Sequence, residues 1–257
     1  MKIAVVIRQL PDLIEPLEID GTGKALDLEE ARFLVNEYDD HAVEQALLLK
    51  EEAGGEVIVV ALDYGDVDQT LFSASAKGVD RILKIPCDEE ISPAPSQAAK
   101  LYAAVLKELN PDLIMLGMQA FDELEGNLCP LLSLEMNLPY VGVIKGVEKG
   151  GDESSIKVFK EYPGAAMARL AVKLPAVLGI LTANQPPRYV PISRIRAVMK
   201  SAQFEETDAA MPAHQPIVQL NTMSIPEIGE GAEMWEGSEE DIAGKILHVL
   251  EEKGVLK

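Results

Sequence analysis

The chain has 257 residues and is acidic, with 43 Asp and Glu against 23 Lys and Arg and a formal net charge of −20. This balance argues against nucleic acid as a partner, because phosphates require a basic surface. Hydrophobic residues make up 47% and charged residues 26%, as in ordinary globular proteins. No apolar run reaches the roughly 18 residues that a membrane span needs. Two cysteines are too few for a disulfide framework, so we expect a cytoplasmic protein.

The first half of the chain alternates short apolar runs with longer helical patterns. The apolar runs predict buried strands at residues 3–7, 57–62, 82–85 and 113–116. The amphipathic patterns predict helices at residues 39–50, 66–77 and 95–109. Strands that alternate with helices of this length form a mostly parallel sheet with helices on both faces. Ligands bind such α/β sheets beyond the carboxyl ends of the strands.

The pattern changes in the second half of the chain. Strands follow one another without a helix between them, at residues 141–147, 155–159, 167–173 and 176–181. They predict an antiparallel extension of the sheet, and residues 1–200 are expected to form one α/β domain. Residues 201–257 hold twelve acidic residues against three lysines, with a last helix at residues 239–252. We expect them to form an extended arm that reaches a partner.

The loop after the fourth predicted strand carries the strongest local signal for a ligand site. It reads LGMQAFDELEGNLCP, with Pro130 expected as the first residue of a helix. Gly126, Asn127 and Leu128 could then direct backbone N–H groups at a phosphate. A plain connecting loop is the alternative, favoured by the acids Asp122, Glu123 and Glu125 unless they face away. Cys129 is either a reactive thiol at a helix start or a small buried residue.

A second candidate segment, NEYDD at residues 36–40, precedes the first predicted helix. Asn36, Asp39 and Asp40 are residue types that cap helices. Tyr38 either lies at the ligand edge of the sheet or packs on the helix. No G-x-G-x-x-G motif follows the first strand, and neither a Walker lysine motif nor a Ser/His/Asp set can be identified.

Several segments, in the same order, are similar to the beta (small) subunit of electron-transfer flavoproteins. They are AVEQALLLKE, VIVVAL, ASAKGVDR, LGMQAFD, the block LPAVLGILTANQPPRYVPISRIRAVMK, and DIAGKILHVLEEKGVL. LGMQAFD resembles the family's Leu-Gly-Lys-Gln-Ala-x-Asp, and KLPAV followed by NQPPRY is the most specific piece. The resemblance covers nearly the whole chain. It implies a Rossmann-like fold of the kind found in adenine-nucleotide hydrolases.

The resemblance also implies a function. A beta subunit pairs with an alpha subunit that holds FAD, and it commonly buries an AMP that has no catalytic use. The pair accepts electrons from a dehydrogenase, often an acyl-CoA dehydrogenase, and passes them to a quinone reductase or another acceptor. Such a chain is an electron carrier rather than an enzyme. The acidic arm would wrap the flavin domain of the alpha subunit.

The resemblance places cofactor contacts at the strand ends and in the loops that follow them. These residues are Val6, Asn36, Glu37, Tyr38, Asp39, Leu62, Gly117, Gln119, Ala120, Phe121, Asp122, Gly126, Asn127, Leu128 and Cys129. Tyr38 falls where the family has an aromatic near the flavin ring, on whose edge it can pack. Ile192 falls where the family presents an apolar anchor to the dehydrogenase, here with Arg194 and Arg196 around it.

The chain departs from the family at two points. The nucleotide loop reads DELEGNLCP, so Leu128 replaces the Thr that binds phosphate and Cys129 replaces a Gly. The segment IPCDEEISPAPSQAA lacks the residues of bifurcating members, which predicts a non-bifurcating carrier. Two alternatives remain open: a stand-alone adenine-nucleotide-binding enzyme or sensor, and a subunit that pairs with alpha but holds no nucleotide.

Overall fold

The computed structural model describes the chain except for residues 88–92, 124–125, 209–219, 228, 230 and 257. The chain divides into two compact units, Met1–Asn221 and Thr222–Lys257. Among the elements that the structure describes, the strands and the first five helices lie in the first unit, and the last helix lies in the second.

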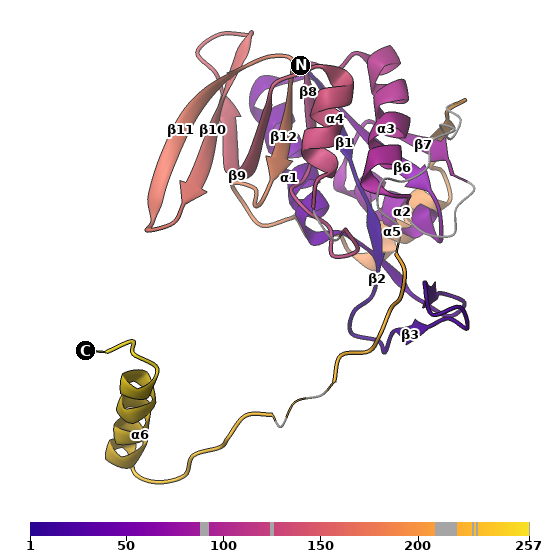
Figure 1. Ribbon diagram of the computed structural model, residues 1–257. Helices are drawn as coiled ribbons and strands as arrows, with labels where there is room; N and C mark the ends of the chain where they lie inside the picture. The colour runs from indigo at the N-terminus through magenta and orange to yellow at the C-terminus, as the bar shows by residue number, and fades with distance from the viewer. Residues whose placement is uncertain (88–92, 124–125, 209–219, 228, 230, 257) are drawn as a thin grey trace. The chain divides into compact units, whose positions relative to one another are not determined.

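The first unit is built on a sheet that has nine strands in the described part of the chain (Figure 1). In order across the sheet they are β11 (Ala166–Lys173), β10 (Ser155–Tyr162), β9 (Tyr140–Lys149), β12 (Ala176–Ile180), β8 (Leu113–Gly117), β1 (Lys2–Val6), β6 (Glu56–Asp63), β7 (Arg81–Pro86) and β13 (Glu205–Glu206). The seven neighbouring strands β9, β12, β8, β1, β6, β7 and β13 are parallel to one another. β10 is antiparallel to both of its neighbours, β9 and β11. The predicted α/β fold with an antiparallel extension is therefore confirmed.

One strand of the predicted extension belongs elsewhere. β12 lies inside the parallel core, paired with β8 on one side and β9 on the other. Its five residues are all buried, as is typical of a strand covered on both faces. The expectation that it is antiparallel was therefore wrong, because the pairing of a buried strand depends on distant segments.

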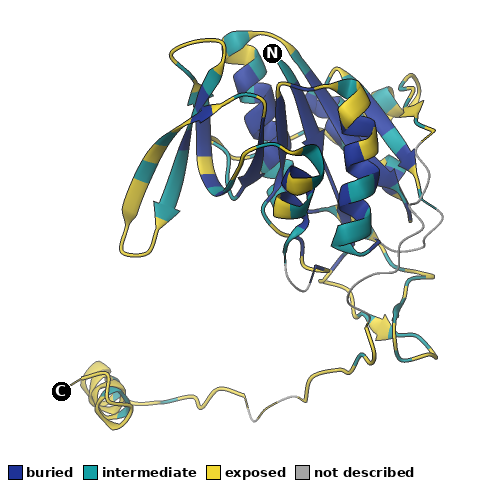
Figure 2. Ribbon diagram, turned by 45° about the horizontal axis from the view of Figure 1, so that its top comes forward, coloured by how far each residue is buried: buried dark blue, intermediate teal, exposed yellow. Residues whose placement is uncertain are grey.

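Helices cover both faces of the sheet. Because successive side chains of β1 point to opposite faces, they show which helices lie on each face. Ile3 and Val5 share a core with α1 (Glu37–Ala53) and α2 (Val67–Lys77). Ala4 and Val6 share the opposite core with α3 (Pro95–Leu109) and α4 (Leu128–Met136). The helix α5 (Ile192–Met199) contacts α2. Figure 2 shows the central strands fully buried between these layers.

The chain between β1 and α1 forms two short antiparallel pairs that the sequence did not predict. β2 (Gln9–Pro11) pairs with β5 (Phe33–Val35), and β3 (Glu18–Ile19) pairs with β4 (Leu26–Asp27). These strands have two or three residues each, too short for a periodic apolar pattern.

The strand order reverses between β1 and β8. β1, β6 and β7 succeed one another in one direction, whereas β8 lies on the other side of β1. Ligands of open α/β sheets bind beyond the carboxyl ends of the strands at such a reversal. The strand ends that flank it here are Val6 and Gly117.

The second unit contains the helix α6 (Glu239–Glu252), with the bounds expected from the sequence. Ser238 and Asp241 form a reciprocal capping box at its start. Ile242, Ile246, Val249 and Leu250 recur at helical spacing, and none of them is buried. No helix in the described residues is long and apolar enough to cross a membrane.

Candidate functional site

A buried arginine lies at the reversal point. Arg8 comes two residues after the end of β1 and is 3% exposed. Its Nε and Nη2 donate to the two carboxylate oxygens of Asp39 at 2.9 and 2.8 Å. Nη2 also donates to the carbonyl of Gly117 at 2.8 Å, and Nη1 donates to Glu123 Oε1 at 2.5 Å. Arg8 therefore joins the ends of β1 and β8 to the start of α1 and to the loop before α4.

Asp39 is the hub of this cluster. It is fully buried, and it also accepts from the backbone N–H groups of Arg8 at 2.8 Å and Gly117 at 2.6 Å. Asn36 occupies the N-cap position of α1, and Asp39 and Asp40 lie in its first turn, as expected, but the Asn36 side chain makes no capping hydrogen bond. Its Nδ2 instead donates to the carbonyl of Gln119 at 2.9 Å. The side chains of Asn36 and Asp39 thus pair with backbone groups at the end of β8 and in the loop after it. Buried backbone N–H and carbonyl groups of this kind need hydrogen-bond partners.

Gly117 must be a glycine for this packing. A Cβ at this position would lie 2.5 Å from Tyr38 Cβ and 2.5 Å from Asp39 Oδ1. The first turn of α1 therefore rests directly on the backbone at the end of β8. Tyr38 is half-buried at the end of β8, and its place at a ligand edge of the sheet stays a prediction.

Glu123 completes the cluster from the loop before α4. Its side chain is buried, and its Oε1 accepts from Arg8. Burial raises the pKa of the Glu123 carboxyl, and the nearby carboxylates Asp39 and Asp122 add to this effect against the opposing attraction of Arg8. Glu125, the remaining acid that weighed against a phosphate, lies outside the described residues.

The helix α4 begins earlier than the sequence suggested. It starts at Leu128, so Pro130 is its third residue and not its first. Proline is tolerated there because the first N–H groups of a helix have no intrahelical partner. Cys129 is buried, and burial raises the pKa of its thiol to about 12. The reactive-thiol reading was therefore wrong, and Cys129 is a small buried residue.

The other predicted cofactor residues divide into core and surface positions. Val6, Leu62 and Leu128 have side chains in the core beside α3 and α4, and Ala120 is buried as well. Glu37, Gln119, Phe121 and Asp122 are exposed, and Gly126 has a positive φ of 57°. The residues that follow β7 at positions 88–92, used above to argue against bifurcation, lie outside the described residues.

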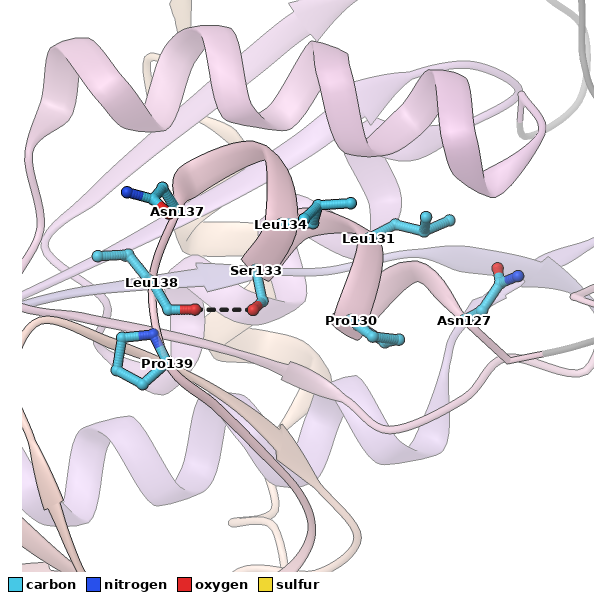
Figure 3. A pocket seen from close by; sticks show the side chains of 8 residues that line it. All are labelled: Asn127, Pro130, Leu131, Ser133, Leu134, Asn137, Leu138 and Pro139. Carbon is cyan, nitrogen blue, oxygen red and sulfur yellow. Dashed lines mark hydrogen bonds between the residues drawn. The ribbon is translucent and has the colours of Figure 1, made fainter.

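A separate hollow of about 580 Å³ lies beside α4 (Figure 3). It is lined by Asn127, Pro130, Leu131, Ser133, Leu134, Asn137, Leu138 and Pro139. Ser133 Oγ donates to the carbonyl of Leu138 at 2.8 Å across it. The lining has no charged side chain, and Asn127 is its single member from the predicted cofactor set. It is therefore distinct from the Arg8 cluster.

The Arg8 cluster does not fit the phosphate of AMP. The guanidinium is already paired with Asp39 and Glu123, and two carboxylates against one cation repel a further anion. The side chains of Leu128 and Cys129 carry neither a hydroxyl nor a charged donor. The residues at the reversal point therefore provide a poor environment for a phosphate.

A second cluster holds the loop before α5 on α1. Arg188 is bidentate to Glu44, with Nε and Nη2 at 2.9 Å from the carboxylate, and its Nη1 donates to Glu51 at 2.8 Å. Glu44 is 3% exposed. Although burial raises the pKa of Glu44, the hydrogen bonds from Arg188 outweigh it and set the pKa below its ordinary value.

The same stripe of α1 holds the preceding residues of this loop. His41 Nδ1 accepts from the N–H of Ala183 at 3.3 Å, and Gln45 Oε1 accepts from the N–H of Asn184 at 2.9 Å. Beyond Arg188 the loop exposes two apolar side chains, Tyr189 at 84% and Ile192 at 64%. The predicted anchor Ile192 is thus on the surface, at the first residue of α5.

Sequence reasoning missed both arginines as organising residues. The signal for Arg8 was a single charged residue directly after an apolar strand, with an acid early in the next helix. The signal for Arg188 was weaker, because Glu44 and Glu51 are spaced like ordinary helix-surface acids. Their partners lie 31 to 144 residues away, a separation that no local pattern reports.

Comparison with known proteins agrees with the fold. Residues 26–212 match the family model described as the electron transfer flavoprotein domain. The electron transfer flavoprotein subunit beta of Methylophilus methylotrophus is 28% identical over 263 residues, covering 98% of each chain. The subunit beta of Bacillus subtilis (strain 168) is 23% identical over 255 residues, covering 97% of each.

A relative with a different name also spans the full length. The acryloyl-CoA reductase electron transfer subunit gamma of Anaerotignum propionicum is 24% identical over 273 residues, covering all of both chains. The family model matches well over half of the chain, and the resemblance to beta subunits is confirmed along its whole length. The chain therefore belongs to the electron transfer flavoprotein family.

Proposed function

We propose that this chain is the beta subunit of a heterodimeric electron-transfer flavoprotein. It would pair with an alpha subunit that holds FAD, and the pair would carry electrons between proteins. The observation that carries the proposal is the similarity to a beta subunit over 98% of both chains. The chain would then act as a carrier and not as an enzyme.

The FAD would supply all the redox chemistry, and this chain would supply position and electrostatics. Two aromatic side chains at the carboxyl edge of the sheet fit this role. Tyr38 is half-buried at the start of α1, and Phe121 is 64% exposed in the loop after β8. Aromatic rings can pack on the flavin edge at a low cost in side-chain entropy.

Of residues 201–257, which the sequence predicted as an arm, Glu205–Glu206 belong to the main sheet as β13, and we propose that the second unit, Thr222–Lys257, contacts the alpha subunit. The apolar stripe of α6 supports this, because Ile246 of the stripe and the neighbouring Leu247 are 47% and 52% exposed. An amphipathic helix with an uncovered apolar stripe gains stability by docking on a partner. The acidic first turn, Glu239 to Asp241, stabilises this helix through its dipole.

The donor would be a flavin-containing dehydrogenase, of the acyl-CoA class by family resemblance, that docks on the loop around Ile192. The acceptor would be a quinone reductase or a similar protein, without bifurcation, in the cytoplasm. Support comes from the exposed Ile192 and from Arg196, which is exposed four residues later on the same face of α5. A small apolar anchor with a charged rim is typical of transient contacts.

Substitution of the anchor tests this docking site. Ile192→Ala should lower the second-order rate of electron transfer from the dehydrogenase about tenfold, the effect expected of an interface hot spot. Stopped-flow flavin absorbance measures this rate. Leu134→Ala is the matched control, because Leu134 is 75% exposed on α4, against the opposite face of the sheet. Equal rates for the two variants would exclude the proposed docking site.

A further inference from the structure

The reversal point between β1 and β8 is where a phosphate would be expected. It has the carboxyl ends of two parallel strands, and the start of α4 lies close by, since Cys129 Sγ donates to the carbonyl of Gly117 at 3.3 Å. It also contains a buried guanidinium, the residue type that binds phosphate best. Geometry alone would make Arg8 a ligand for an anion.

The protein supplies that anion itself. One edge of the Arg8 guanidinium is paired with Asp39, which comes from α1. Nη1, on the remaining side, donates to Glu123 at 2.5 Å, a short charge-assisted hydrogen bond. Glu123 belongs to the loop before α4, from which an anion-binding loop would contact a phosphate. Its carboxylate therefore takes the position that a phosphate oxygen would need.

The unsatisfied groups of the cluster also argue against an anion. Asn36 Oδ1 and Glu123 Oε2 are buried and accept no hydrogen bond from the described residues. Because Asn36 Nδ2 donates to a carbonyl, its amide orientation is fixed. Both remaining groups are acceptors, so they require a donor such as a water or a hydroxyl group. A phosphate oxygen would be repelled by them.

We propose that Glu123 is a built-in anion that replaces a nucleotide phosphate at Arg8, so that this chain folds and functions without AMP. The carboxylate pairs with Nη1 of the guanidinium, where an external anion would otherwise bind. The proposal concerns the chain itself and holds whether or not the chain carries electrons.

The test measures anion binding by the full-length chain. Calorimetric titration uses AMP, inorganic phosphate and adenosine as separate probes, on the wild type, Glu123→Ala and Glu123→Gln. Wild type should bind neither AMP nor phosphate. Glu123→Ala frees Arg8 Nη1 and should bind both, with an affinity at least about tenfold above the weakest that the titration detects. Adenosine, which has no phosphate, should show no such gain.

One control variant and the Glu123→Gln variant separate a loss of charge from a loss of folding. Glu108→Ala removes the same charge from an exposed position on α3 and should behave as wild type. Glu123→Gln keeps the shape of the side chain, so it folds even if the Ala variant does not. It removes the charge, and a smaller gain in phosphate affinity is expected.

Three results would overturn the proposal. The first is stoichiometric AMP released from denatured wild-type chain. The second is phosphate affinity in both Glu123 variants equal to that of wild type. The third is an equal gain for adenosine and AMP, which would place the effect at a base site and not at Arg8.

Discussion

At the end of β1, one arginine connects four separate parts of the chain. The Arg8–Asp39 pair is almost fully excluded from solvent, with exposures of 3% and 0%. A buried pair of this kind is weak evidence of net stabilisation, because removing two charges from water costs about as much as their attraction returns. Its effect on the specificity of the fold is clearer. Asp39 can accept hydrogen bonds from both Arg8 and the N–H of Gly117 in one arrangement of α1 against β8.

Removal of the arginine should therefore destabilise the fold strongly. Arg8→Met leaves Asp39 buried and unpaired, and it should lower the free energy of unfolding by about 3–5 kcal/mol. Urea denaturation measures this change. Arg81→Met is the control, because Arg81 is 37% exposed and its pairs with Glu56 and Glu205 lie at the surface. That variant should lose less than about 1 kcal/mol, and equal losses would contradict the role assigned to Arg8.

The close approach at Gly117 gives a second prediction at this scale. Gly117→Ala places a methyl group 2.5 Å from Asp39 Oδ1 and displaces the first turn of α1. The expected cost is about 1–3 kcal/mol of unfolding free energy, as for other overpacked sites. Gly21→Ala is the control, since a Cβ there meets nothing within 4 Å. A Gly117→Ala variant as stable as wild type would show that α1 does not rest on β8.

Residue types predicted less of this site than of the core. Local pattern identified the NEYDD segment and the loop after β8 as candidate regions, and the structure brings Asn36 and Asp39 together with Gly117. It did not show which groups pair. Asp39 is a residue type that often caps helices, so its sequence position suggested a local role. Because the strand order places β8 beside the start of α1, its carboxylate instead binds Arg8 and the N–H of Gly117.

At the scale of elements, α1 has two separate tasks. Its first turn closes the end of the sheet, and a stripe formed by His41, Glu44 and Gln45 accepts the backbone N–H groups of the loop at residues 183–188. These positions are three and four residues apart, so they lie on one helix face. The loop that presents Ile192 is thereby attached to the same helix that borders the proposed flavin edge.

This attachment should depend on pH. The pKa of Glu44 is lowered in the folded state, so its contribution is present above the unfolded pKa of about 4.3 and is lost as the pH falls through the folded value. Glu44→Gln should cost about 1–3 kcal/mol of unfolding free energy at pH 7. The difference from wild type should shrink below about pH 4. Denaturant titrations at several pH values measure it, and a pH-independent difference would contradict the charge effect.

Element boundaries were predictable where capping chemistry is strict. The structure confirms residues 95–109 and 239–252 as helices, because Pro95 starts one and Ser238 caps the other. Prediction failed at α4, since a proline fits any of the first helical positions. It also failed at β12, whose parallel pairing depends on β8 and β9 and not on its own residues.

At the scale of the whole molecule, the two units have different compositions and different expected tasks. The first contains both hydrophobic cores, and the described residues of α6 in the second include none that is buried. Removal of residues 222–257 should therefore leave the melting temperature of the first unit unchanged. It should abolish copurification with the alpha subunit. A truncated chain that still binds alpha would contradict the role proposed for the arm.

The most direct measurement of the central claim is cofactor analysis after co-expression of the full chain with a flavoprotein alpha subunit from the same genome. The expected result is a yellow heterodimer that contains stoichiometric FAD, is reduced by a dehydrogenase and is reoxidised by an acceptor. Stoichiometric AMP in that complex would overturn the role of Glu123 and leave the carrier function intact. A colourless chain that does not associate with the alpha subunit would contradict the carrier function itself.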